Sequence, residues 1–159
     1  VGERSAAQVL ALADIQRVIG RMDPLPGARE FLDSARELTQ VIILSDTFSH
    51  FAQPLMRKLG FPTLFCNELI VDADGTVSGY SLRQKDGKKK AVEALQSICM
   101  KVMASGDSYN DLSMILTAED GALFCAPEGI KAAHPDVPAY TTYNELLSHV
   151  KDFIAHSGE

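Results

Sequence analysis

The hydrophobic residues of the chain follow two kinds of spacing, and each kind predicts a different element. Apolar side chains that recur every three or four positions predict helices. These helical stretches are 6–19, 31–38, 48–59, 91–100, 109–118 and 143–155, with a short one after Pro127. Short apolar runs between them predict strands, at 41–44, 63–66, 101–105 and 122–125. The run 41–44 has no polar alternation, which is typical of a strand that helices cover on both faces.

The stretch 67–83 differs from the rest of the chain. Two apolar runs, 69–71 and 77–82, flank the residues 72–76, which contain an Asp-Gly pair. Asp-Gly between two strand-like runs predicts a β-hairpin and therefore an antiparallel insertion. Elsewhere strands alternate with helices, and this order predicts right-handed crossovers. We therefore expect an α/β fold, a doubly wound parallel sheet with a β-hairpin insertion.

Composition excludes several classes of function. The chain has 159 residues, 46% of them hydrophobic, and a formal net charge of −6, which suits one globular domain. Its acidic balance argues against nucleic-acid binding, because the only basic run is 88–90. No apolar run approaches the roughly 18 residues of a membrane span. Three cysteines without CxxC spacing, Cys66, Cys99 and Cys125, predict buried free thiols and a cytoplasmic protein.

The residues that follow the predicted strands are candidates for chemistry, because ligands of such sheets bind at the carboxyl ends of the strands. Ser45, Asp46 and Thr47 follow the run 41–44. The Ser45 hydroxyl and the next two backbone N–H groups, where we expect a helix to begin, form an anion site. The alternative is a plain helix N-cap, which an isolated Ser-Asp-Thr favours.

A second candidate is the sequence Gly-Asp-Ser-Tyr-Asn-Asp at 106–111, which follows a strand and opens a helix. Asp107 and Asp111 lie about one helical turn apart, and two carboxylates in one crevice suit Mg²⁺. The alternative, of equal weight, is a helix start capped by Asp107 or Ser108, with Asp111 favourable to the helix dipole. Lys88 also opens a helix, where a cation opposes the dipole, and this indicates a role other than helix stability.

Taken in order, the strand-end Ser, the Lys that opens a helix and the strand-end Gly-Asp-x-x-x-Asp resemble motifs two, three and four of the haloacid dehalogenase superfamily of phosphatases. The stretches 41–48, 53–64, 82–86 and 106–111 are most similar to its phosphoserine phosphatase branch. Within that branch they resemble the bifunctional phosphoserine phosphatase/homoserine phosphotransferases. The resemblance covers roughly residues 14–150.

The resemblance implies a phosphomonoester hydrolase that works through a phosphoaspartate, with Mg²⁺ and a small phosphorylated amino acid as substrate. Water, or homoserine, then accepts the phosphoryl group. It also implies a role for each matching residue. By this resemblance, the phosphoryl oxygens are held by Ser45, Asp46 and Thr47, and Lys88 neutralises their charge. Asp107 ligates Mg²⁺, and Asp111 orients the metal site. Asn110 contacts the substrate.

One part of the family pattern has no counterpart in the sequence. The first motif, an apolar strand ending in Asp-x-Asp or Asp-x-Glu, should precede the cap helices. We therefore expect residues 1–24 to be a remnant of a helical cap, and 25–159 a Rossmannoid core without its first strand and nucleophile, inactive alone. The sequence Asp-Ala-Asp at 72–74 spells the motif but lies in the predicted hairpin, so we interpret it as a turn. The absent strand is expected between the strands 41–44 and 102–105.

Two alternatives remain for the function. The first is a non-catalytic homologue or fragment that only binds Mg²⁺ or phosphate. The second is a receiver-type signalling domain, which also places Asp, Ser or Thr, and Lys at strand ends. Its lysine should end a strand, whereas Lys88 opens a helix after a hairpin. We also count a homodimer among the expected partners, and neither nucleic acid nor a membrane.

Overall fold

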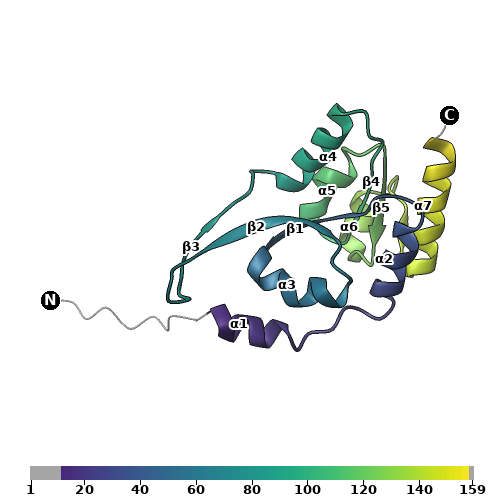
Figure 1. The fold of residues 1–159 in the computed structure, drawn as a ribbon. Helices are drawn as coiled ribbons and strands as arrows, with labels where there is room; N and C mark the ends of the chain where they lie inside the picture. The colour runs from purple at the N-terminus through teal and green to yellow at the C-terminus, as the bar shows by residue number, and fades with distance from the viewer. Residues whose placement is uncertain (1–11, 158–159) are drawn as a thin grey trace.

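The computed structural model describes residues 12–157, in which seven helices flank two three-stranded sheets (Figure 1). The helices are α1 Leu12–Ile19, α2 Ala28–Arg36, α3 Ser49–Lys58, α4 Gly87–Ser97, α5 Tyr109–Ile115, α6 Glu128–Ala133 and α7 Tyr143–Ser157. The strands are β1 Ile42–Phe48, β2 Thr63–Val71, β3 Val77–Ser81, β4 Met103–Gly106, β5 Asp120–Phe124 and β6 Ala139–Tyr140. Strands and helices alternate, so the α/β prediction is confirmed, while the first part of the predicted helix 6–19 lies outside the described residues.

The strands form two sheets, whereas the sequence predicts one. In the first sheet β1 pairs with β2 in parallel and β2 pairs with β3 antiparallel. In the second sheet β4, β5 and β6 are all parallel. Within residues 12–157 no ladder joins β1 to β4. This agrees with the prediction that these two strands are not direct neighbours, and it leaves helix α4, which packs against both β1 and α5, as a link between the sheets.

The predicted hairpin is present, but its first arm is longer than expected. The runs 63–66 and 69–71 belong to one nine-residue strand, β2, whose far half pairs with β3. At the turn Gly75 has φ of 86°, and the Asp74 carboxylate accepts a hydrogen bond from the backbone N–H of Thr76 at 2.9 Å. The interpretation of 72–74 as a turn is thus confirmed, and Figure 1 shows this turn at the far end of the first sheet.

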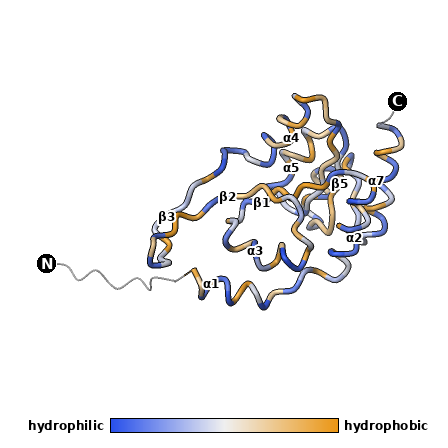
Figure 2. Tube along the Cα trace, in the orientation of Figure 1, coloured by the Kyte–Doolittle hydropathy of each residue, from blue (hydrophilic) through white to orange (hydrophobic). Residues whose placement is uncertain are grey.

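The most deeply buried side chains lie between the second sheet and its helices. Leu123 of β5, Ile130 of α6 and Val92 of α4 are at most 1% exposed and share one hydrophobic cluster. Leu44 of β1 packs against the same cluster. The core therefore reaches across both sheets. Figure 2 shows the complementary pattern on the outer helices α1 and α7, where hydrophobic and hydrophilic residues alternate.

A proline inside α3 explains how α1 is held. Pro54 has no N–H group, so the carbonyl of His50, four residues earlier, loses its helical partner. The side-chain amide of Gln16 in α1 donates a hydrogen bond to that carbonyl at 3.1 Å. Gln16 therefore supplies the donor that this half-buried carbonyl needs, and the hydrogen bond joins the two helices.

The cysteine prediction is partly wrong. The three thiols are free, as predicted, but Cys99 and Cys125 are exposed and Cys66 is only half-buried. Cys99 and Cys125 have φ of 65° and 52° just beyond α4 and β5, where the chain leaves the packed elements. Among residues 12–157 no helix is both long and apolar enough to cross a bilayer.

The core assignment can be tested by comparing two leucines. We expect Leu123→Ala, which opens a cavity at a fully buried position, to lower the free energy of unfolding by about 2–5 kcal/mol. Leu116→Ala at an exposed position should change it by no more than about 0.5 kcal/mol. Urea denaturation of both variants gives the two values. Equal losses would contradict a core centred on β5.

Candidate active site

The end of β1 leaves the regular ladder at the residues that the sequence singled out. In the register with β2, Leu44 lies opposite Phe65 and Phe48 lies opposite Asn67, so β1 advances four residues while β2 advances two. The intervening residues 45–47 form a bulge. Bulges re-aim side chains and are frequent beside active sites.

This bulge corrects one expectation. No helix begins at Asp46, because the backbone stays extended to Phe48 and helix α3 begins at Ser49. The N–H group of Thr47 donates to the Ser45 hydroxyl at 3.3 Å. The three residues therefore form a bulge within β1. The N-terminus of α3 does not supply the anion site that we expected at these residues.

Lys88 in the first turn of α4 bridges the two sheets. Its Nζ lies 2.7 Å from Asp111 Oδ1 at the start of α5 and 3.1 Å from Asp46 Oδ2 in the bulge. The side chains of Lys88 and Asp111 are only 15% and 8% exposed, whereas that of Asp46 is 63% exposed. One ammonium group thus connects a buried carboxylate with one that is open to solvent.

The second oxygen of Asp111 caps helix α5. Asp111 Oδ2 accepts hydrogen bonds from the N–H groups of Asp107 and Ser108 and from the Ser108 hydroxyl, at 3.1, 3.0 and 2.7 Å. Together with Ser108 it forms a capping box. A Cβ atom on Gly106 would collide with the Asp111 side chain, so glycine leaves the room that this side chain needs. The capping alternative is therefore realised at Ser108 and Asp111, in addition to the ion pair with Lys88.

The ion pair changes the pKa values of both partners. Burial, the largest single effect, would raise the pKa of Asp111, but hydrogen bonds from Lys88 and Ser108 outweigh it, and the pKa lies below the ordinary value. Burial would likewise lower the pKa of Lys88, but hydrogen bonds and charges of Asp111 and Asp46 outweigh it, and the pKa is raised. Both groups are therefore held in their charged forms.

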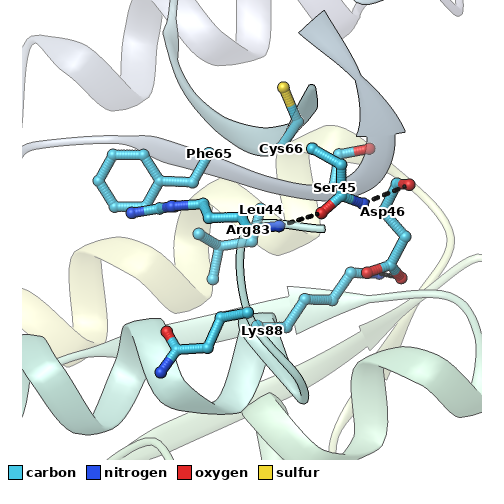
Figure 3. Close-up of a pocket in the computed structure, with 10 residues that line it drawn as sticks. Leu44, Ser45, Asp46, Phe65, Cys66, Arg83 and Lys88 are labelled. Carbon is cyan, nitrogen blue, oxygen red and sulfur yellow. Dashed lines mark hydrogen bonds and ion pairs between the residues drawn. The ribbon is translucent and has the colours of Figure 1, made fainter. Parts of the chain in front are cut away.

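A hollow opens beside Lys88 (Figure 3), between the end of β1, strand β2 and the connection to α4. Its lining residues are Leu44, Ser45, Asp46, Phe65, Cys66, Asn67, Arg83, Gln84, Gly87 and Lys88. Figure 3 shows Lys88 extending toward Asp46, while Arg83 runs along Phe65 in the opposite direction. The Arg83 guanidinium carbon lies 4.1 Å from the centroid of the Phe65 ring. The hollow is thus cationic near both of its ends.

The structure brings together some of the predicted site residues. Ser45, Asp46 and Lys88 line the hollow, and Asp111 lies behind Lys88. Asp107 and Asn110 are exposed at the start of α5 and are not among the lining residues, nor is Thr47. Sequence reasoning gave no role to the lining residues Phe65, Asn67, Arg83 and Gln84. Phe65 lies in the predicted strand 63–66, Asn67 and Arg83 lie in the predicted hairpin stretch, and Gln84 follows it.

The donor set at α5 can be compared with the needs of Mg²⁺, which takes one or two protein carboxylates and completes its shell with water and phosphate oxygens. Asp111 is already engaged by Lys88 and by its own helix start. The Asp107 side chain has no hydrogen bond or ion pair within residues 12–157. Across the same residues no three acidic, His or Cys side chains cluster as a metal site. The residues fit a Mg²⁺ ion held by the single carboxylate of Asp107 and by oxygens from outside this cluster.

Fold and site together define a hydrolase class with a Rossmann-like α/β core and charged groups at the strand ends. A family model for haloacid dehalogenase-like hydrolases matches residues 2–119, and the chain belongs to this family. It is 53% identical over 137 residues to phosphoserine phosphatase ThrH from Pseudomonas aeruginosa, covering 86% of this chain and 67% of that protein. It is 51% identical over 148 residues to phosphoserine phosphatase from Pseudomonas syringae pv. tomato, covering 93% and 61%.

A solved structure agrees with these relatives. The structure described as a phospho-aspartyl intermediate analogue of phosphoserine phosphatase is 26% identical and superposes with a TM-score of 0.72, covering 88% of this chain and 70% of that one. The resemblance to the phosphoserine phosphatase branch is thereby confirmed. The chain spans 61–67% of the length of the two Pseudomonas proteins.

The close approach of Gly106 to Asp111 gives a first test of the site. We expect Gly106→Ala to displace the Asp111 side chain and to lower the free energy of unfolding by about 1–3 kcal/mol, as overpacking does. Gly87→Ala is the matched control, because nothing lies within 4 Å of the added Cβ beside Lys88. Urea denaturation measures both. A stable Gly106→Ala variant would contradict the contact.

The lowered pKa of Asp111 predicts a pH dependence. The ionised carboxylate stabilises the fold above the ordinary carboxyl pKa of about 3.9, and this contribution is lost as the pH falls through the lower folded pKa. The unfolding free energies of wild type and Asp111→Asn should therefore differ by about 2–4 kcal/mol at pH 5–7. The difference should shrink below about pH 4.

Denaturant titrations across pH measure this difference. In a Lys88→Met background the loss should begin at higher pH, because the partner that lowers the pKa of Asp111 is gone. A difference that stays constant down to acid pH, or that is unaffected by Lys88→Met, would contradict the assigned coupling.

Proposed function

We propose that the protein is a Mg²⁺-dependent phosphomonoester hydrolase of the phosphoserine phosphatase type, which hydrolyses phosphoserine and can pass the phosphoryl group to homoserine. The observation that carries the proposal is the position of Lys88, held between Asp46 and Asp111 beside the Ser45 hydroxyl. Support for the substrate comes from the two similar Pseudomonas proteins, both of which are phosphoserine phosphatases.

The proposed division of labour follows from charge. Phosphoryl transfer depends chiefly on positioning and on stabilising the negative charge of the transferring group. The ammonium of Lys88 supplies a fixed positive charge, while the Ser45 hydroxyl and the backbone of Asp46 and Thr47 hold phosphoryl oxygens. Asn110 contacts the substrate, and Asp111 keeps Lys88 charged and in place. When bound, Mg²⁺ at Asp107 would add further neutralisation of phosphate charge.

The proposal assigns the nucleophilic Asp to a position outside the residues that line the hollow. Asp46 is the only carboxylate among those lining residues in the described part of the chain, and Lys88 neutralises it. We further propose that residues 1–24 belong to the helical cap and 25–159 to the core. Within residues 12–157 no ladder joins the edge strands β1 and β4, and this supports a place for one more strand between them.

A second candidate function is binding of Mg²⁺ or phosphate without catalysis. The same observation favours it, because the hollow offers cations and a hydroxyl but no uncommitted carboxylate. Hydrolysis assays on two proteins distinguish the candidates: the 159-residue chain, and a protein that carries an Asp-x-Asp or Asp-x-Glu strand ahead of Val1.

We expect the longer protein to release phosphate from phosphoserine with Mg²⁺, and the 159-residue chain to release none. Lys88→Met in the longer protein should lower kcat/KM by at least about 100-fold, in the range measured when one charge-stabilising group is removed. Phosphate release is followed colorimetrically, and a homoserine phosphotransfer product by ³¹P NMR. Turnover by the 159-residue chain that Asp72→Asn abolishes would move the nucleophile to the hairpin and contradict the proposal.

The metal assignment has its own test. Mg²⁺ titrated into the protein should shift the amide NMR signals around the start of α5, and Asp107→Asn should abolish the shifts because the free carboxylate is lost. Asp136→Asn, at another exposed position, is the control and should bind as wild type. Equal Mg²⁺ affinity in wild type and Asp107→Asn would exclude Asp107 as the ligand.

A further inference from the structure

The carboxamide of Asn67 connects two segments of the hollow that do not otherwise pair. Its Nδ2 donates to the backbone carbonyl of Asp46 at 3.0 Å, and its Oδ1 accepts from the backbone N–H of Arg83 at 2.9 Å. Asn67 lies on β2 opposite Phe48, at the position where the ladder resumes after the bulge. Both ends of one rigid amide are therefore used, each on a different segment.

Neither segment pairs in a β-ladder at this point. Asp46 lies in the bulge, where no residue of β2 is its ladder partner. Arg83 is the second residue of the connection between β3 and α4, and the first turn of α4 carries Lys88. The connection is also anchored by the Arg83 guanidinium over Phe65, which lies two residues before Asn67 and hence on the same face of β2.

These contacts form a closed circuit. Asn67 joins Asp46 to Arg83, the chain runs from Arg83 to Lys88, and Lys88 returns to Asp46 through the 3.1 Å ion pair. Only a group that donates and accepts at once can fill the place of Asn67. A carboxylate accepts but does not donate, and an aliphatic side chain does neither.

We propose that Asn67 is a positioning residue, which fixes the distance between the bulge with Ser45 and Asp46 and the connection that delivers Lys88. In this way it sets the affinity of the hollow for a phosphoryl group. The inference rests on the proposed function only for the identity of the ligand, because the contacts of the circuit are present without a ligand. Asn67 touches no reacting atom in this assignment, and it acts through the backbone of Asp46 and Arg83.

Two substitutions separate the two hydrogen bonds. Asn67→Asp keeps the acceptor for Arg83 and loses the donor to Asp46, whereas Asn67→Leu loses both. Ser49→Ala is the matched control, because it removes the 2.6 Å hydrogen bond from Ser49 to Glu68, the neighbour of Asn67 on β2, at residues that do not line the hollow.

The first measurement needs no ligand. Amide hydrogen exchange at Arg83 should become faster in Asn67→Leu and stay slow in Asn67→Asp and Ser49→Ala. The side-chain ¹⁵N signal of Lys88 should shift in both Asn67 variants and not in Ser49→Ala. Unchanged exchange at Arg83 in Asn67→Leu would overturn the proposal.

The second measurement uses inorganic phosphate as the probe, titrated into the 159-residue chain and followed by NMR. Asn67→Leu should bind phosphate about 5- to 10-fold more weakly than wild type, because the loss of both hydrogen bonds loosens the hollow. Asn67→Asp should bind still more weakly, because it adds a negative charge to the hollow. Ser49→Ala should bind as wild type, and an equal loss there would reduce Asn67 to a structural contact and overturn the proposal.

The two measurements also separate this inference from the proposed function. If wild type binds no phosphate while the exchange pattern at Arg83 is as expected, the phosphate site fails and the circuit stands. If phosphate binds and all variants bind equally, the site stands and the role of Asn67 is refuted.

Discussion

The ammonium group of Lys88 is the contact on which the rest of the site depends. A charge removed from water is costly unless opposite charges and hydrogen bonds compensate it. Asp46 supplies that compensation from β1 and Asp111 from helix α5, which packs against β4. The position of Lys88 therefore fixes the start of α5 relative to the bulge at the end of β1, although no ladder joins β1 to β4 within residues 12–157.

Helix α4 makes this link on one face. Val92 follows Lys88 by one helical turn, so the two side chains point the same way. Val92 is 1% exposed and belongs to the cluster that Leu44 joins. A hydrophobic contact and an ion pair, one turn apart, thus hold α4 between the sheets. The hydrophobic contact provides most of the stabilising free energy, because ion pairs of this kind gain little net free energy after desolvation. The ion pair instead fixes where the charged groups of Lys88, Asp46 and Asp111 lie relative to one another.

The sequence predicts these features to different degrees. Lys88 at the start of a helix and the Gly-Asp-x-x-x-Asp stretch at a strand end could be identified because local spacing determines both. The bulge at 45–47 could not, since it depends on how β1 and β2 align, and this alignment is a tertiary property. Asn67 was missed for the same reason, because its partners lie 21 and 16 residues away along the chain.

The break between β2 and the hairpin was also predicted wrongly, and the reason is physical. Asn67 and Glu68 interrupt the apolar run of β2, so the pattern resembles a loop between two short strands. In the structure both polar side chains have partners, Asn67 in the hollow and Glu68 at Ser49. A polar residue in a strand is tolerated where it finds hydrogen bonds, and no local pattern reveals such partners.

Within residues 12–157, β1 and β4 are each an edge strand of their sheet, with no ladder between them. Strand edges carry unpaired N–H and C=O groups, which favour pairing with another extended segment. The β1–β2 and β4–β5 pairs are parallel, Ser45 lies at the start of the bulge in β1, and Asp107 follows the carboxyl end of β4. A parallel strand inserted between β1 and β4 would end at the same edge, within the crevice where ligands of open α/β sheets bind.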